Sequence, residues 1–283
     1  MADLGLLTIK IQQMTIESTN DNTPTTPAIT YSECYAQVFL GDCLELYKNI
    51  EPKSIDLILT DLPYGTTACK WDTVIPFDKL WEMVNYLLKP NGAFITTASQ
   101  PFTSALVMSN PKMFKYEWVW DKHIPRNFIN AKIMPMQKHE NVLVFGKDKL
   151  IYNPQMTLRD KPVTVKNYSK KLKDSSYKLN TDGSNLKSYT YTHKNPDTII
   201  LNCWEANAGK THPTQKPVKL MEYLIKTYSN ENMTIFDPCM GSGTTGVACK
   251  NLNRNFIGIE KDENYFNIAK NRIESHTVQS DLF

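Results

Sequence analysis

Short apolar runs alternate with amphipathic stretches along most of this chain, and the pattern predicts alternating strands and helices. Residues 55–60 (Ile-Asp-Leu-Ile-Leu-Thr) are almost continuously apolar, which is typical of a strand covered on both faces of a parallel sheet. Residues 78–88 and 217–228 carry apolar side chains at helical spacing, and the second stretch has a proline in its first turn. The alternation predicts an α/β fold with a doubly wound, mostly parallel sheet.

Shorter segments extend this pattern over the rest of the chain. Further strands are expected at 37–40, 93–97, 116–120, 141–145, 233–236 and 255–259. Further helices are expected at 101–108, at 244–252 and, after a cap at Asp262, through Ile273. Residues 1–32 are polar and rich in Thr and Asn, and we expect a flexible lead there and a tail at 277–283.

Composition is that of a soluble globular protein, with 41% hydrophobic and 22% charged residues. There is no run of about 18 apolar residues and no signal-peptide pattern at the N-terminus, so neither a membrane span nor export is expected. The six cysteines have no C-x-x-C spacing and no paired histidine nearby. We expect them to be free thiols in a reducing compartment, and we predict no metal site.

Charge is distributed unevenly, although the whole chain carries only +3. Residues 147–194 contain ten Lys and one Arg against four Asp, a net charge of +7, whereas the rest of the chain carries −4. Five tyrosines and few aliphatic residues accompany these cations. Such a mixture suits a surface that neutralises phosphates and stacks on bases, but a solvated, partly mobile insert has the same composition. Composition alone leaves both interpretations open.

A glycine-rich turn, Phe236-Asp-Pro-Cys-Met-Gly-Ser-Gly-Thr-Thr-Gly246, follows one predicted strand. Gly241 and Gly243 precede a predicted helix, whose free N–H groups and dipole favour an anion. Glu260 ends the next strand, 19 residues after Gly241, where an acid can bind ribose hydroxyls. The full dinucleotide glycine pattern is absent, so S-adenosylmethionine, a nucleoside that carries an amino acid, fits better. A turn without a ligand is the alternative, and the placement of Asp237 and Glu260 favours a ligand.

A second turn, Thr60-Asp-Leu-Pro-Tyr-Gly65, directly follows the apolar strand at 55–60. Open α/β sheets bind ligands at the carboxyl ends of their strands, which is where Asp61 stands. Pro63 restricts the backbone, so that the Asp61 carboxylate, the Leu62 carbonyl and the Tyr64 ring form a rigid set. The two oxygen groups can each accept one hydrogen of an exocyclic NH₂, and the ring can stack on an extruded base. These residues are also common in ordinary turns, so the motif alone is a weak signal.

Together these motifs resemble those of the DNA amino-methyltransferases, which methylate the N6 of adenine or the N4 of cytosine. Residues 61–64 resemble their catalytic Asp/Asn/Ser-Pro-Pro-Tyr motif, with Leu62 in place of the first proline, and residues 236–243 resemble their cofactor motif. The catalytic motif comes first and a basic segment separates the two, as in the permuted β group of the family. Segments 39–45 and 211–217 also resemble family segments, and the likeness extends over about residues 35–275.

The resemblance implies a class I S-adenosylmethionine-dependent methyltransferase of Rossmann-like fold that flips its target base out of double-stranded DNA. The catalytic residues that the resemblance implies are those of one turn, Asp61, Leu62, Pro63 and Tyr64. The residues implied to bind the cofactor are Asp42, Cys43, Asp61, Lys216, Phe236, Asp237, Pro238, Gly241, Ser242, Gly243, Thr244, Thr245 and Glu260. Among these, Lys216 is expected to pair with the methionine carboxylate, and Asp42 to contact the adenine of the cofactor.

The position of the basic segment, between the two motifs, favours DNA recognition over an idle insert. We expect a recognition insert at 147–205 inside a catalytic domain formed by residues 33–146 and 206–276. The DNA-contacting residues implied are Lys70, Trp71, Arg159, Lys161, Lys166, Lys170, Lys171 and Lys173. Trp71 is explained equally well as a core residue.

Aspartate at the first position of the catalytic motif favours adenine in this family. The nearest alternative is an N4-cytosine enzyme on the same scaffold, and a catalytically silent DNA-binding relative and an RNA enzyme are the others. The resemblance further implies a cytoplasmic protein encoded by a bacterium or a phage. It leaves open whether the protein forms a homodimer and whether it has a restriction endonuclease as a partner.

Overall fold

A computed structural model describes residues 7–16, 29–65, 73–166, 188–204 and 215–277 of the chain. The chain divides into two compact units, one formed by Met1–Asn153 with Thr198–Phe283 and the other by Pro154–Asp197. From the sequence, the inserted segment is expected at 147–205. The smaller unit lies inside that range and is shorter at both ends.

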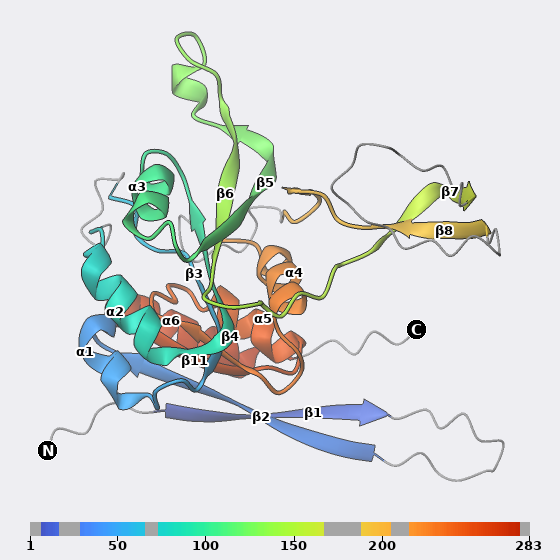
Figure 1. Cartoon of the computed structure of the whole chain (residues 1–283). Helices are drawn as coiled ribbons and strands as arrows, with labels where there is room; N and C mark the ends of the chain where they lie inside the picture. The colour runs from blue at the N-terminus through green and yellow to red at the C-terminus, as the bar shows by residue number, and fades with distance from the viewer. Residues whose placement is uncertain (1–6, 17–28, 66–72, 167–187, 205–214, 278–283) are drawn as a thin grey trace, which may run out of the picture. The chain divides into compact units, whose positions relative to one another are not determined.

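A nine-stranded sheet forms the centre of the larger unit (Figure 1). Its strands, in spatial order, are β1 (Leu7–Ile16), β2 (Ile29–Leu40), β11 (Asn255–Glu260), β10 (Thr234–Asp237), β3 (Ile55–Thr60), β4 (Leu88–Ala98), β6 (Gln137–Phe145), β5 (Phe114–Arg126) and β9 (Ile199–Ile200). The five neighbouring strands from β2 to β4 are parallel. β1 and β6 run antiparallel to their neighbours, so the sheet is mixed with a parallel centre, as predicted.

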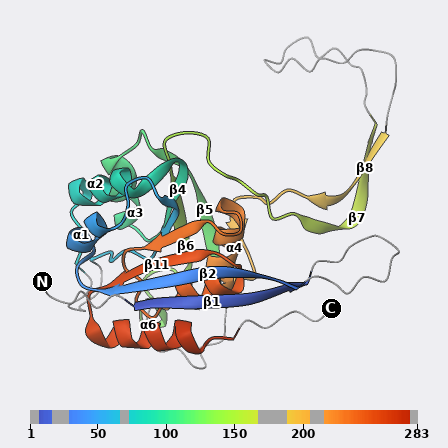
Figure 2. The same ribbon diagram turned by 90° about the horizontal axis from the view of Figure 1, so that it is seen from below.

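Helices pack on both faces of this sheet (Figures 1 and 2). α1 (Cys43–Leu46), α2 (Phe77–Leu87) and α3 (Phe102–Ser109) contribute buried side chains to one hydrophobic cluster. α4 (Val218–Tyr228), α5 (Thr244–Asn251) and α6 (Glu263–Ser275) contribute to the other. The short 3₁₀ turns are η1 (Tyr47–Asn49) and η2 (Phe128–Asn130). Layers on both sides of a mainly parallel sheet define the doubly wound α/β class.

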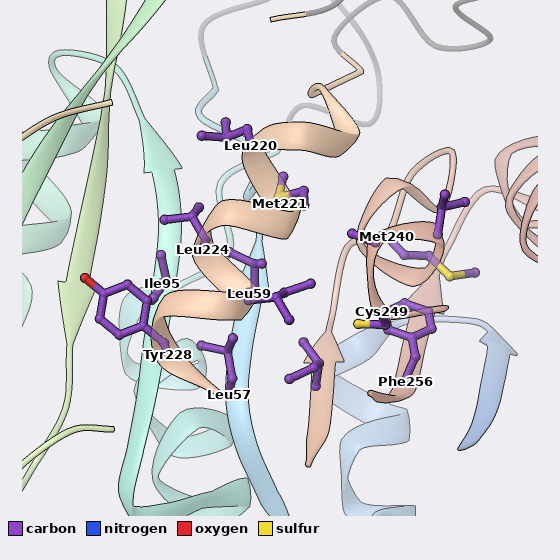
Figure 3. Close-up of a cluster of buried hydrophobic side chains, with 14 of the residues drawn as sticks. Leu57, Leu59, Ile95, Leu220, Met221, Leu224, Tyr228, Met240, Cys249 and Phe256 are labelled. Atoms are coloured by element: carbon purple, nitrogen blue, oxygen red, sulfur yellow. The ribbon is translucent and has the colours of Figure 1, made fainter. Parts of the chain in front are cut away.

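The apolar run of β3 is explained by these two clusters. Leu57 and Leu59 point into the cluster beneath α4, whereas Ile58 points into the opposite one, and all three side chains are fully buried. Figure 3 shows Leu57 and Leu59 among Leu224 and Tyr228 of α4. A strand that is buried on both faces cannot alternate between apolar and polar residues, so the predicted central position of residues 55–60 is confirmed.

The structure corrects the expectation of a flexible lead at residues 1–32. β1 pairs with β2 in an unbroken antiparallel register from Leu7 opposite Val38 to Ile16 opposite Ile29. Residues 7–11 (Leu-Thr-Ile-Lys-Ile) alternate apolar and polar side chains, which is the strand signal that the polar composition of the segment concealed. The prediction is therefore wrong for residues 7–16 and 29–32.

The smaller unit contains an antiparallel hairpin of β7 (Thr157–Lys166) and β8 (Ser188–Lys194). The Arg159 Nε donates a hydrogen bond to the backbone oxygen of His193 across the hairpin, at 3.1 Å. Side chains of both strands are exposed, including Tyr189 and Tyr191. No strand is predicted here from the sequence, because the charge of the segment dominates its composition. Residues 163–165 (Val-Thr-Val) and 189–191 (Tyr-Thr-Tyr) do alternate between apolar or aromatic and polar side chains.

Parallel order brings four chain segments to one edge of the larger unit's sheet. The carboxyl ends of β2, β11, β10 and β3 lie side by side, because these strands are parallel neighbours. Asp42, Glu260, Asp237 and Asp61 stand at or just beyond these four ends. The fold thus gathers acids that are up to 218 positions apart in the sequence.

Gly243 caps α5 in a left-handed conformation (φ 77°), where a Cβ would lie 3.0 Å from the Cβ and 3.1 Å from the Cα of Ala269. Gly241 is also left-handed (φ 52°), but a Cβ there would meet nothing within 4 Å. We expect Gly243→Ala to lower the free energy of unfolding by about 3 kcal/mol, through backbone strain and overpacking together. Gly241→Ala, the matched control, should cost about 1 kcal/mol from strain alone. Chemical denaturation measures both, and equal losses would contradict this account.

Candidate active site

A cavity of about 920 Å³ opens at the edge where the four parallel strands end. Its lining includes most of the predicted site residues, namely Asp42, Cys43, Asp61, Leu62, Pro63, Tyr64, Lys216, Asp237, Pro238, Gly241, Ser242, Thr244, Thr245 and Glu260. Phe236 is fully buried in the core and does not line the cavity, and Gly243 packs against α6. The two predicted motifs, on β3 and β10, therefore face one shared space.

Asp61 is held by three donors from separate parts of the chain. Its Oδ1 accepts hydrogen bonds from the Tyr64 hydroxyl, at 2.7 Å, and from the Thr97 hydroxyl. Its Oδ2 accepts from the Lys216 Nζ at 2.6 Å. An ionised carboxylate has about four lone-pair sites, so these donors leave one acceptor site on Oδ2. Asp61 is thus fixed in direction and can still accept one hydrogen from a molecule in the cavity.

Leu62 explains how the turn tolerates the missing first proline. Its side chain is buried in the hydrophobic cluster beneath α2 and α3. Pro63 follows and lines the cavity. Packing of the Leu62 side chain holds the turn against the hydrophobic cluster. The Pro63 ring restricts the backbone dihedral angles of the turn. Two different constraints therefore hold the backbone that carries Asp61.

Tyr64 packs with its ring against Phe102 of α3, with centroids 5.2 Å apart and planes inclined by 28°. Its hydroxyl donates to Asp61, and its oxygen lies 2.8 Å from the hydroxyl oxygen of Thr97 near the end of β4. Burial and the neighbouring Asp61 raise the pKa of Tyr64 well above its usual value, so the phenol stays neutral and donates. Stacking of Tyr64 on a target base stays a prediction.

Lys216 joins Asp61 to a second carboxylate that the sequence analysis did not assign to the site. Its Nζ lies 3.4 Å from Oε2 of Glu140 on β6, and Glu140 also forms an ion pair with Lys122 on β5. Burial alone would lower the pKa of Lys216, but the charges of Asp61 and Glu140 outweigh burial and raise it. The expected pairing of Lys216 with a methionine carboxylate differs from the contacts found here, which place its cation against Asp61 and Glu140.

The glycine-rich turn after β10 is held by hydrogen bonds on both sides. Asp237 accepts from the backbone N–H of Cys239, at 3.1 Å, and from the Thr245 hydroxyl, at 2.7 Å. Burial raises the pKa of Asp237 to about 6. Arg272 of α6 donates to the Ser242 carbonyl, at 3.1 Å, and to the Thr244 hydroxyl, at 3.0 Å. Arg272 therefore shapes the turn from outside the motif, and no local sequence signal identified it.

Glu260 is oriented by the backbone of the same turn. One carboxylate oxygen accepts from the N–H of Gly241 and the other from the N–H of Asp262, at 2.8 and 2.9 Å. Burial raises the pKa of Glu260, although these backbone hydrogen bonds oppose the shift. The backbone N–H of Lys261 also hydrogen-bonds to this carboxylate, so about one of its four lone-pair sites is left to accept a hydroxyl donor from the cavity. That is the arrangement expected for binding a ribose.

Asp42 and the two cysteines line the same cavity. Asp42 caps α1 through the backbone N–H of Leu44, at 2.9 Å, and pairs with the Lys261 Nζ, also at 2.9 Å. The Cys43 side chain and burial raise the pKa of the Cys239 thiol well above its usual value. Cys239 is thus a protonated thiol, and we infer that it lines the cavity as a small side chain rather than as a reactive thiolate.

Three of the eight predicted DNA-contacting residues lie in the described part of the chain, and all three belong to the smaller unit. Lys70, Trp71, Lys170, Lys171 and Lys173 lie outside the described residues. Arg159 and Lys161 are exposed on β7 of the smaller unit, and Lys166 ends the same strand. The residues missed by the sequence analysis are Thr97, Lys122, Glu140 and Arg272, all of which act through contacts between distant elements.

A family model for N6 and N4 methyltransferases, described as DNA methylase, matches residues 55–271, more than half of the chain. The chain belongs to the DNA methylase family. Curated relatives of this DNA methylase include the Type II methyltransferase M.HpaI of Haemophilus parainfluenzae, 28% identical over 253 residues that cover 84% of this chain and 74% of the relative. Another is the Type II methyltransferase M2.LlaDCHI of Lactococcus lactis subsp. cremoris, 28% identical over 82% of this chain and 87% of the relative.

Solved structures give the same assignment. The M1.HpyAVI–SAM complex is 29% identical, with a TM-score of 0.56, over 84% of this chain and 99% of that chain. The cytosine-N4-specific PvuII DNA methyltransferase, with 16% identity and a TM-score of 0.59 over 87% and 88% of the two chains, shows the fold alone. This DNA methylase thus has the class I S-adenosylmethionine-dependent methyltransferase fold.

The cavity of this DNA methylase fits S-adenosylmethionine, the methyl donor of the family. The backbone at Gly241 faces open space, since a Cβ there would meet nothing within 4 Å. α5 begins without a side-chain cap, which leaves N–H groups for a carboxylate. Glu260 and Asp42 supply anchored acceptors for hydroxyl and amino groups. Among the helices described, none is long and apolar enough to cross a membrane.

Proposed function

We propose that this DNA methylase transfers a methyl group from S-adenosylmethionine to the exocyclic N6 of an adenine in double-stranded DNA. The observation that carries the proposal is the Asp61 carboxylate, which three donors hold in the cavity with one acceptor site left on Oδ2. An exocyclic amino group is a hydrogen donor of the kind that this site can accept. The cofactor residues on β10 and β11 line the same cavity.

Asp61 and the Leu62 carbonyl are proposed to accept the two hydrogens of the amino group. Accepting both hydrogens draws the nitrogen toward tetrahedral geometry and frees its lone pair. The proton that the nitrogen loses on methylation passes to Asp61 or to water. The Lys216 ammonium compensates the charge of Asp61, and Glu140 and Lys122 hold that ammonium in place. The bound cofactor supplies an electrophilic methyl group on a positively charged sulfur. The chain itself contributes mainly positioning and preorganised electrostatics.

The target base has to leave the duplex to reach Asp61. Its extrusion and its stacking on Tyr64 are part of the proposal. The smaller unit, with Arg159 and Lys161 exposed and most of the +7 segment within its bounds, is proposed to bind the DNA backbone and to recognise the site. A cytoplasmic location stays a prediction of the family resemblance, which leaves a homodimer and a restriction endonuclease partner open.

Replacing Pro154–Asp197 by a short Gly-Ser linker is expected to abolish DNA binding and to leave S-adenosylmethionine binding unchanged. Both attachment points belong to the larger unit, since Asn153 N donates to Thr227 O at 2.7 Å and Val119 N donates to Thr198 O at 2.8 Å. Fluorescence anisotropy with unmethylated duplex DNA and calorimetry with the cofactor measure the two affinities. The double substitution Arg159→Ala with Lys161→Ala should lower DNA affinity less and reduce its salt dependence. Unchanged DNA affinity after the deletion would contradict the assignment.

Expression in a host that lacks DNA methylation tests the function itself. Mass analysis of the nucleosides and modification-sensitive sequencing of the host DNA report the base, the sequence context and the activity together. We expect N6-methyladenine at a defined sequence, absent in an Asp61→Ala control. N4-methylcytosine would replace the adenine assignment, and unmodified DNA with an intact fold would indicate a silent DNA-binding relative. Modified nucleosides in RNA alone would contradict the DNA substrate.

A further inference from the structure

The β5–β6 hairpin ends in a tip of exposed apolar side chains. Ile129, Phe128 and Ile133 are 95%, 81% and 79% exposed, the highest values among the large apolar side chains that the structure describes. Figure 1 shows the hairpin extending beyond the end of α3. Exposed apolar clusters are costly in water, so a tip of this kind marks a surface that meets a partner.

Hydrogen bonds within the tip keep these side chains pointing outward. Asn127 adopts a left-handed conformation (φ 68°), and its side-chain oxygen accepts from the Asn130 amide group at 2.8 Å. The Asn130 carbonyl then accepts from the N–H groups of Ile133 and Met134, both at 3.0 Å. At the base of the hairpin, the His123 ring stacks on Trp204 with centroids 4.6 Å apart. The tip is therefore an ordered turn that presents apolar groups.

The charges on the hairpin indicate which kind of partner it binds. From Lys122 to Lys138 the sequence contains four basic residues and no acidic one. Lys122 and Lys138 are paired with Glu140 and Asp121, whereas no ion pair of Arg126 or Lys132 occurs within the part of the chain that is described. A second copy of the tip would place like charges together. A nucleic acid offers phosphates for these cations and a base stack for the apolar groups.

The tip also continues the wall of the active site. Ile124, Pro125, Arg126, Asn127 and Phe128 line the cavity that contains Asp61. A base that enters this cavity leaves a gap in its duplex, and the gap has to be filled or closed. The hairpin is the apolar element that leads outward from the cavity.

We propose that the β5–β6 tip is a wedge that enters the duplex where the target base leaves it. Phe128 and Ile129 occupy the vacated space in the base stack, and Arg126 and Lys132 contact the flanking phosphates. Proteins that insert apolar side chains between base steps use the same combination of wedge and cation. The inference rests on the proposed function, because it assumes a base that is methylated outside the duplex.

The test compares two synthetic duplexes that carry the sequence found methylated in the expression host. In one the target base is paired, and in the other it is mispaired and already easy to extrude. The variant is the double substitution Phe128→Ala with Ile129→Ala. Met108→Ala is the control, because Met108 is 72% exposed on α3, outside the hairpin. We expect the double variant to methylate the paired duplex at least about tenfold more slowly than the wild type, and the mispaired duplex within about threefold of it.

Each of the following outcomes would contradict the proposal that the tip acts as a wedge. Equal losses on both duplexes would make the tip a general contact, and unchanged rates on both would remove it from the reaction. A wild-type dimer that dissociates in the double variant, seen by sedimentation, would make the tip an interface between copies. Methylation by the wild type on neither duplex would mean that the proposed function has failed, which is distinct from a failure of the wedge alone. S-adenosylmethionine affinity and thermal unfolding equal to those of Met108→Ala show that the double variant is folded.

Discussion

Asp61→Ala should slow methyl transfer by at least about 100-fold, because the substitution removes the anchored acceptor that we propose for the amino group. S-adenosylmethionine binding should persist, since the Gly241 turn and Glu260 are held by contacts that do not involve Asp61. Single-turnover transfer of labelled methyl groups to unmethylated DNA measures the first effect, and calorimetry measures the second. Near-normal transfer would contradict the mechanism.

Asp61→Asn separates charge from shape in this experiment. The amide keeps one acceptor oxygen but cannot compensate the Lys216 ammonium, whose Nζ lies 2.6 Å from Oδ2. We expect Asn to be closer to Ala than to Asp in rate, because the Lys216 and Lys122 ammonium groups would then share the single carboxylate of Glu140. Full activity of Asp61→Asn would show that hydrogen-bond acceptance alone is sufficient and that the charge of Asp61 has no role.

Glu260→Ala should weaken S-adenosylmethionine binding by about 10- to 100-fold, the range expected for hydrogen bonds to a charged group. The substitution removes the acceptor proposed for the ribose and also frees the N–H groups of Gly241 and Asp262. Calorimetric titration with the cofactor measures the affinity directly. The KM for S-adenosylmethionine should rise with it, while DNA affinity without cofactor stays unchanged.

Glu260→Gln is the matched variant for this second prediction. Glutamine keeps one carbonyl acceptor for the turn but offers an amide donor where the second acceptor was. We expect an affinity between those of wild type and Glu260→Ala. An affinity of Glu260→Ala equal to that of the wild type would remove Glu260 from the cofactor site.

Much of the fold could be read from the sequence because its signals are local. The continuous apolar run at 55–60 predicts a central strand, and Asp262 predicts the start of α6, where it accepts from the N–H groups of Asn264 and Tyr265. The turns at Asp61 and Gly241 are likewise local, since Pro63 and the glycines restrict or release the backbone at their own positions. These motifs, in their order along the chain, were enough to suggest the family.

β1 shows the limit of that method. Its alternating residues are the signal of a strand, but the polar composition of residues 1–32 indicated a flexible lead. The hairpin in Pro154–Asp197 was missed for a related reason. The alternating stretches of β7 and β8, at residues 163–165 and 189–191, are short and lie within a strongly basic segment. Short alternating stretches inside polar or charged segments are therefore hard to find from sequence alone.

The sequence by itself determined the local chemistry of this protein: a carboxylate after one buried strand, a glycine-rich turn after another, and a basic segment between them. Only the tertiary structure decided how these parts act together. Lys216 reaches Asp61 across 155 positions, and Glu140 and Lys122 complete the charge network from the antiparallel strands β5 and β6. Strand order in the sheet follows from packing of distant segments, and buried charges select partners by proximity in space. Neither leaves a periodic trace along the chain.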